Sequence, residues 1–154
     1  MIEYNNNSIE IRKVTTPKEI EYLLKNFDKE FTNNLTKRIP NLKEYAVKLS
    51  NNSINLVAIH NSEQLGFICF YCNDTKFRKA YISQLCVSEL HRRKGIGNYL
   101  INEAIKYCNN EGMNTLDLEV AKSNNSAINL YKHNGFIETK DNPQFNSFLM
   151  RKKI

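Results

Sequence analysis

The chain has 154 residues and a net charge of +6, with 41% hydrophobic and 25% charged residues, which is typical of a soluble globular protein. This length suits one domain over residues 1–154 and leaves little room for a second. No apolar run approaches the ~18 residues of a membrane span, and MIEYNNNSIE has no apolar stretch typical of a signal peptide, so we expect a cytoplasmic protein without a membrane partner.

The basic residues gather in two short runs, Arg92-Arg93-Lys94 and Arg151-Lys152-Lys153. Such charge suits nucleic acid or a phosphate-rich small molecule. We expect the second run to be a solvated end. A nucleic-acid binder needs a continuous basic face with exposed aromatic side chains, whereas the aromatic residues here fall mostly inside predicted strands, so we do not expect nucleic acid as a partner.

The first third of the chain predicts one strand followed by helices. Ser8 to Val14 alternates enough for a strand. Thr16-Pro17-Lys18-Glu19 predicts a helix start, with Thr16 as the cap and Pro17 at the first position. Residues 28–50 follow a helical pattern that Pro40 interrupts, so two further short helices are expected there.

The rest of the chain alternates between strands and helices. We expect two strands joined by a hairpin, a third strand, a helix that Gly112 ends, a fourth strand, a helix capped by Ser123 or Asn124 and ended by Asn134-Gly135, and a closing pair of strands. In chain order these are 54–59, 65–72, 80–87, 96–108, 114–120, 124–133, 136–138 and 145–150.

This order predicts an α/β chain of the α+β type. The strand–helix–strand portion from residue 80 to residue 120 requires two parallel strands, and the flanking connections are short enough for antiparallel pairing. We therefore expect a mixed, mostly antiparallel central sheet with helices on both faces.

Cys69 and Cys72 form a CxxC pair, which is a pattern of metal and redox sites. No second pair follows at a zinc-ligand spacing, and residues three apart on a strand point to opposite faces. We expect buried free thiols and no metal.

The turn from Arg92 to Gly97 leads from a predicted strand into a predicted helix. Glycines let backbone amides approach a ligand closely, and a helix start adds unpaired N–H groups and partial positive charge. This combination suits a pyrophosphate; a glycine-rich turn with a solvated basic rim is the alternative. A Walker loop is excluded because GxxxxGK[ST] is absent, and a Rossmann fingerprint because its third glycine is missing.

Two motifs in this order resemble the GNAT superfamily of acyl-CoA-dependent N-acetyltransferases. Arg92-Arg93-Lys94-Gly95-Ile96-Gly97 is similar to the family's [R/Q]xxGx[G/A] pyrophosphate loop, and Asn124-x-x-Ala127-x-x-Leu130-Tyr131-x-x-x-Gly135-Phe136 to its second motif. The resemblance implies the GNAT fold, with strands 80–87 and 114–120 splayed apart, and acetyl-CoA as co-substrate. Residues 1–50 match only in pattern.

The resemblance also implies a set of cofactor-binding residues. Strand residues would bind the pantetheine arm, the turn and first helical residues would bind the pyrophosphate, and the residue before the second motif's helix would cap it, contact CoA, or both. These are Leu85, Cys86 and Val87; Arg92, Arg93, Lys94, Gly95, Ile96, Gly97 and Asn98; and Asn124.

Acetyl transfer from a thioester requires a proton donor for the leaving thiolate. By resemblance this is Tyr131, whose phenol, with a pKa near 10, is neutral at pH 7. The alternative is a tyrosine that packs its helix face. Cys86 could in principle act as a nucleophile, but the family usually transfers the acetyl group directly, so we expect a buried thiol.

The amine must also lose a proton. Glu119 lies five residues before Asn124, a spacing that resembles family members with a glutamate base; the alternative is a charge at a wet strand end. Tyr81 and Gln84 replace the carboxylate that other members carry on the preceding strand, so no base is expected there. We assign no role to His60, His91 or His133.

These observations predict an enzyme that moves an acetyl group from acetyl-CoA to a primary amine. The acceptor stays open between a small molecule, an amino sugar and a protein N-terminus, with the net charge favouring an acidic acceptor slightly. A non-catalytic acyl-CoA-binding module is the alternative; it would lack Tyr131 and Glu119. The sequence is compatible with a homodimer.

Overall fold

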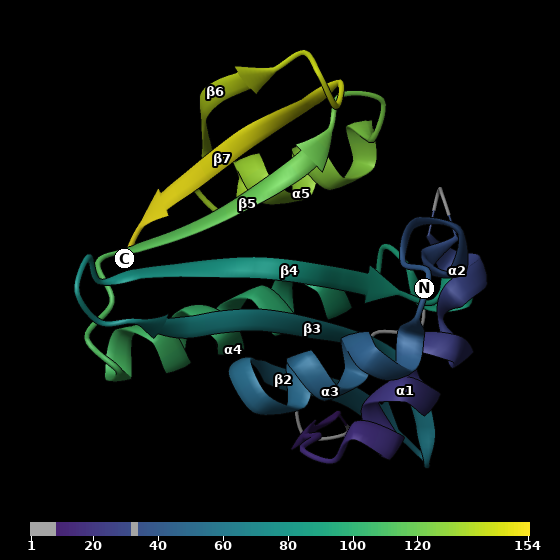
Figure 1. Ribbon diagram of the computed structural model, residues 1–154. Helices are drawn as coiled ribbons and strands as arrows, with labels where there is room; N and C mark the ends of the chain where they lie inside the picture. Colours follow the sequence, from purple (N-terminus) through teal and green to yellow (C-terminus); the bar gives the residue numbers. More distant parts are fainter. Residues whose placement is uncertain (1–8, 32–33) are drawn as a thin grey trace.

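The computed structural model describes residues 9–31 and 34–154. Its strands form one seven-stranded sheet in the order β1-β2-β3-β4-β5-β7-β6. Figure 1 labels the strands from β2 to β7. Every neighbouring pair is antiparallel except β4 and β5, which confirms the predicted mixed sheet. The strands are β1 (Glu10–Lys13), β2 (Ile54–His60), β3 (Glu63–Asp74), β4 (Lys79–Val87), β5 (Thr115–Ala121), β6 (Ile137–Asn142) and β7 (Ser147–Lys153).

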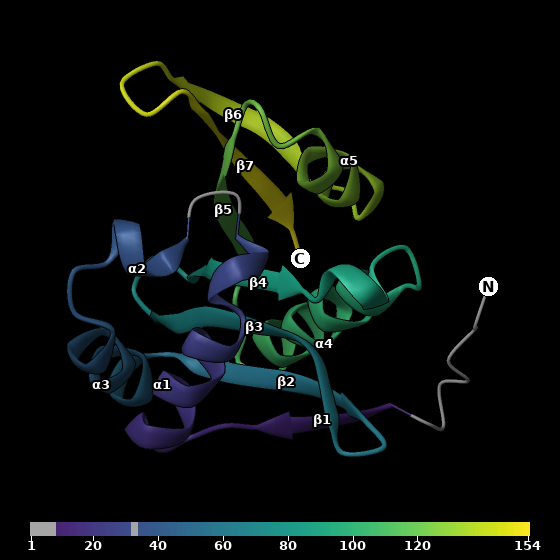
Figure 2. The same ribbon diagram turned by 90° about the vertical axis from the view of Figure 1, so that its right-hand side faces the viewer.

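Helices cover both faces of the sheet, as expected (Figure 2). The elements are α1 (Pro17–Asn26), η2 (Asp28–Glu30), α2 (Leu35–Arg38), α3 (Leu42–Asn52), η3 (Glu89–His91), α4 (Ile96–Asn110) and α5 (Asn125–His133). α1 and α3 lie on one face, and α4 and α5 on the other (Figure 2). In the described part of the chain, no helix is long and apolar enough to cross a membrane.

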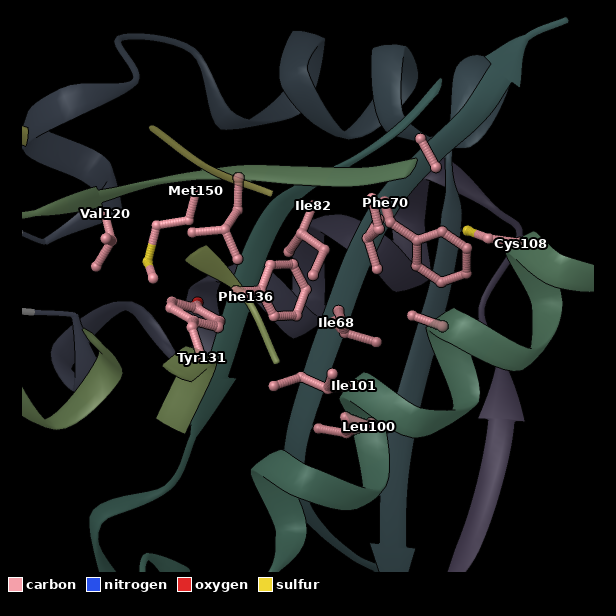
Figure 3. Close-up of a cluster of buried hydrophobic side chains, with 14 of the residues drawn as sticks. Ile68, Phe70, Ile82, Leu100, Ile101, Cys108, Val120, Tyr131, Phe136 and Met150 are labelled. Carbon is pink, nitrogen blue, oxygen red and sulfur yellow. The ribbon is translucent and has the colours of Figure 1, made fainter. Parts of the chain in front are cut away.

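The sheet therefore separates two apolar cores. The core under α4 and α5 includes Phe70, Leu100, Phe136 and Met150, all at most 2% exposed (Figure 3). The core under α1 and α3 centres on Phe67. The CxxC pair is divided between them, because Cys69 belongs to the second core and Cys72 packs against the first. This confirms that the two thiols point to opposite faces.

Local sequence signals account for several element boundaries. The Thr16 hydroxyl accepts a hydrogen bond from the Glu19 N–H at 3.3 Å and Pro17 opens the helix, which confirms the predicted cap. The hairpin between β2 and β3 is tighter than predicted, because only Asn61 and Ser62 form its turn, both with positive φ. The predicted first strand is shorter than expected; it starts at Glu10, and Ser8 lies outside the described residues.

The parallel pair β4–β5 opens partway along its length. Residues 79–82 of β4 pair with residues 115–118 of β5, and no pairing follows toward Val87. A bulge in the β3–β4 ladder places one extra residue, Ser83, in β4, and its hydroxyl donates to the Cys69 carbonyl at 3.1 Å. Bulges bend a strand and raise its twist. This confirms the predicted splay and leaves one edge of β4 open.

The basic run Arg151-Lys152-Lys153 is half-exposed to exposed, which agrees with the expected solvated end, but it is also part of a strand. It forms the last part of β7, between β5 and β6. The Arg151 guanidinium donates two hydrogen bonds of 2.7 Å to the Asp117 carboxylate. These hydrogen bonds raise the pKa of Arg151. Phe145, predicted to begin this strand, lies before it and is 68% exposed. Charge density alone does not reveal that this run belongs to a strand or that Asp117 pairs with Arg151.

Removing this pair should weaken the attachment of β7 to β5. We expect Arg151→Gln to lower the free energy of unfolding by about 1 kcal/mol, since a bidentate guanidinium–carboxylate pair exceeds an ordinary surface pair but both groups stay partly solvated. Urea unfolding followed by circular dichroism measures this. Lys153→Gln, which removes the same charge from an exposed side chain, is the control; an equal loss in both variants would contradict a specific role for the pair.

Candidate active site

The turn between η3 and α4 presents bare backbone amides. Arg93 and Gly95 have positive φ values of 61° and 85°, and no side chain within residues 9–31 and 34–154 caps α4. The first intrahelical bond runs from the Tyr99 N–H to the Gly95 carbonyl at 3.0 Å, so the N–H groups of residues 96–98 have no acceptor within the helix. A Cβ on Gly95 would meet nothing within 4 Å. The turn thus offers donors, partial positive charge and open space for an anion.

Two contacts distant in sequence hold this turn in place. The His91 imidazole lies 2.9 Å from the Glu63 carboxylate of the β2–β3 hairpin. The Arg92 guanidinium donates to the Val87 carbonyl at 3.0 Å and to both the carbonyl and the carboxylate of Glu30 at 3.0 and 3.2 Å. Arg92 was predicted as a cofactor contact; its observed partners tie the end of β4 to η2. The sequence carries no signal for these pairings, which bridge 28 and 62 positions.

A pocket of about 480 Å³ begins at this turn and follows the open edge of β4. It contains every predicted cofactor-binding residue except Lys94, together with Tyr131. His91 and His133 also line it, although the sequence suggested no role for them. The predicted residues in its wall are Leu85, Cys86, Val87, Arg92, Arg93, Gly95, Ile96, Gly97, Asn98, Asn124 and Tyr131.

The pocket is lined by residues from both sides of the sheet. Leu85 and Tyr131 belong to the α4–α5 side, whereas Cys86 packs in the core under α1 and α3, and Glu30 follows α1. Asn124 caps α5, which is one of its two predicted roles. Its side-chain oxygen accepts a hydrogen bond from the Ala127 N–H at 3.2 Å.

Tyr131 lies at the inner end of the pocket. Its ring packs edge-on against Phe136, with centroids 5.7 Å apart, at the border of the apolar core (Figure 3). Its hydroxyl makes no hydrogen bond to any residue that the structure describes. Burial, followed by the proximity of Cys86 and Tyr81, raises the pKa of Tyr131 above its ordinary value near 10. The phenol is therefore a neutral donor over the whole physiological range.

Glu119 lies outside the pocket wall, on the opposite face of β5 from the α4–α5 core. Its carboxylate accepts from the Ser147 hydroxyl and, at 3.1 Å, from the Asn142 side-chain amide. Both partners are neutral, so neither compensates its charge. Burial, then Glu119 and Asp117, raises the pKa of Tyr81, which places this tyrosine near both carboxylates. The structure thus puts Tyr131 and Glu119 on opposite faces of the sheet.

Cys86, the thiol that could in principle act as a nucleophile, is poorly suited to attack a thioester. Its side chain is buried, and burial raises the pKa of its thiol to about 12. The thiolate is the reactive form of cysteine, and at pH 7 it is nearly absent here. This favours direct transfer over an acyl-cysteine route.

Comparison with known proteins agrees with this geometry. Residues 20–136 match the model of the acetyltransferase (GNAT) family. The chain is 43% identical over 65 residues to N-alpha-acetyltransferase 30 of Xenopus laevis, covering 42% of this chain and 23% of that protein. It is 33% identical over 106 residues to N-alpha-acetyltransferase 50 of Danio rerio, covering 66% and 63%. The chain thus spans less than two thirds of the length of these curated relatives.

A solved structure shares the whole arrangement of elements. The PaiA N-acetyltransferase from Thermoplasma acidophilum, solved in complex with coenzyme A, superimposes with a TM-score of 0.76 at 25% identity, over 96% of this chain and 99% of that one. Together with the matched family model, the splayed parallel pair and the glycine turn, this places the protein by descent as well as by geometry. The chain belongs to the acetyltransferase (GNAT) family.

Proposed function

We propose that this protein transfers an acetyl group from acetyl-CoA directly to a primary amine, in the gap between β4 and β5. The observation that carries the proposal is one continuous pocket that joins the bare amides of the turn, the open edge of β4 and the Tyr131 hydroxyl. An extended, amide-bearing ligand can pair with an open strand edge as an added strand does. Its pyrophosphate would then meet the N–H groups of residues 96–98.

The side chains divide the chemistry between them. As the amine nitrogen bonds to the acetyl carbonyl carbon and the carbon–sulfur bond breaks, Tyr131 donates its hydroxyl proton to the departing sulfur. A backbone N–H of β4 near Cys86 or Val87 stabilises the negative charge on the carbonyl oxygen. Glu119 takes the proton that the amine releases, directly or through water. Protons therefore balance, with one given to the thiol and one taken from the amine.

We further propose that the acceptor is the α-amino group of a polypeptide. Support comes from the relatives named N-alpha-acetyltransferases and from the sheet face opposite α4 and α5. There the Glu119 carboxylate, whose hydrogen-bond partners Ser147 and Asn142 are neutral, lies near Tyr81, and Arg151 already neutralises Asp117. This environment suits a cationic amine better than the acidic acceptor that net charge suggested. An α-amine is also roughly 10% free base at pH 7, against about 0.04% for a lysine side chain.

The test is thiol release from acetyl-CoA in the presence of a panel of amines. We expect turnover with short peptides that have a free α-amine, and none with the same peptides blocked at the N-terminus, with glucosamine or with a polyamine. Turnover only with a small amine would overturn the acceptor assignment. Tight binding of acetyl-CoA without turnover on any amine would favour the non-catalytic module.

Glu119→Gln should lower kcat/KM at pH 7 about tenfold, because an amide cannot accept the proton of the amine. The amide oxygen of glutamine can still accept hydrogen bonds from Ser147 and Asn142, as Glu119 does. The loss in kcat/KM should become smaller as the pH rises past the pKa of the α-amine near 8, because most of the amine is then already deprotonated. Steady-state rates across pH measure this. Glu111→Gln, at the far end of α4, is the control. A deficit that stays constant with pH would indicate a structural role instead.

A further inference from the structure

Asn134 bridges the two helices that form the outer part of the pocket. It follows α5 as its C-cap residue, and its side-chain Nδ2 makes two hydrogen bonds. One goes to the Leu130 carbonyl at 2.8 Å, and the other to Oδ1 of Asn98, in the first turn of α4, at 2.7 Å. Asn98 lines the pocket, whereas Asn134 does not.

These two bonds determine how both amides are turned. A backbone carbonyl can only accept, so the atom of Asn134 that faces Leu130 must be its NH₂ group. The same NH₂ group faces Asn98, so the Asn98 atom in contact with it must be the oxygen. The NH₂ group of Asn98 is therefore directed away from Asn134, and no described residue accepts from it.

We propose that Asn134 is a positioning residue, which holds the Asn98 side chain with its NH₂ group available to the pyrophosphate of acetyl-CoA. This inference rests on the proposed function. The N–H groups of residues 96–98 and the Asn98 amide then form one set of donors around the same anion. Without Asn134, the Asn98 amide can rotate and present its oxygen to the phosphate, because the terminal torsion of asparagine has no strong preference between the two orientations.

The test is a double-mutant cycle read by calorimetric titration of acetyl-CoA. Asn134→Asp has no N–H to donate, so Asn98 must turn its NH₂ toward the new carboxylate and its oxygen toward the phosphate. We expect affinity to fall about thirtyfold in the otherwise unchanged protein and by a clearly smaller factor when Asn98 is already alanine, because only the direct repulsion between the new carboxylate and the pyrophosphate then remains. Asn134→Ala, which only frees the Asn98 amide, should cost about fivefold and likewise lose its effect in the Asn98→Ala background.

A matched control is Asn110→Asp, which adds the same charge at the C-terminal end of α4, away from the pocket, and should leave affinity unchanged. Melting temperatures report whether each variant folds, and Asn134→Ala carries the cycle if Asn134→Asp does not. Equal losses with and without the Asn98 side chain would overturn the positioning role while leaving the proposed function intact. Absence of acetyl-CoA binding to the unmodified protein would overturn both.

Discussion

Tyr131→Phe is expected to lower kcat about a hundredfold. This is the lower end of the range for a lost proton donor, because a thiolate leaves readily and needs little help from an acid. The binding constant for acetyl-CoA should not change. Phenylalanine keeps the ring that packs on Phe136, so the variant removes only the hydroxyl that faces the pocket. Single-turnover rates and calorimetric titration separate the two quantities.

The pH dependence gives a second readout for Tyr131. Burial raises the pKa of its hydroxyl, so the protonated, donating form persists to higher pH than that of an exposed tyrosine. We therefore expect no fall in kcat up to pH ~10, where an ordinary phenol would already be about half ionised. Tyr22→Phe, at a side chain that is 65% exposed, is the matched control. A kcat for Tyr131→Phe within threefold of the unmodified enzyme would show that the residue only packs.

Gly95→Asp is expected to weaken acetyl-CoA binding about a hundredfold relative to Gly95→Asn. Both side chains tolerate positive φ better than most and have nearly the same size, so strain and steric filling cancel in the comparison. What remains is a negative charge placed at an exposed position beside the turn that would hold the pyrophosphate.

The salt dependence of these two variants distinguishes charge from shape. Dissolved salt screens the repulsion between exposed charges. The difference in acetyl-CoA affinity between Gly95→Asp and Gly95→Asn should therefore become smaller as the ionic strength rises from about 0.05 M to about 0.5 M. Equal affinities of the two variants at low salt would mean that no phosphate approaches this turn.

Local signals in the sequence were sufficient for most of the fold. The capping residues at Thr16 and Asn124 act within three positions of themselves, so their hydrogen bonds follow from short-range geometry. The apolar period of α4 and the alternation of β5 reflect which face is buried, and both elements formed as predicted. The splay of β4 and β5 was also anticipated, although from family resemblance rather than from the residues.

Features that depend on distant partners were not predictable in the same way. The sequence does not reveal that Arg151 pairs with Asp117, or that Arg92, predicted as a cofactor contact, also pairs with Glu30. The Asn98–Asn134 contact joins positions 36 apart whose sequence environment suggests only a turn and a helix end. Each depends on tertiary packing, for which a single sequence carries no periodic or compositional signal.

The most direct test of the account is a calorimetric titration of the unmodified protein with acetyl-CoA, with CoA and ATP as comparisons. We predict one binding site of micromolar affinity for acetyl-CoA and CoA, and much weaker binding of ATP, which has phosphates for the turn but no pantetheine for the open edge of β4. If neither acetyl-CoA nor CoA binds, the central claim is contradicted, because the glycine turn would then not bind a pyrophosphate and the pocket would hold no acetyl donor.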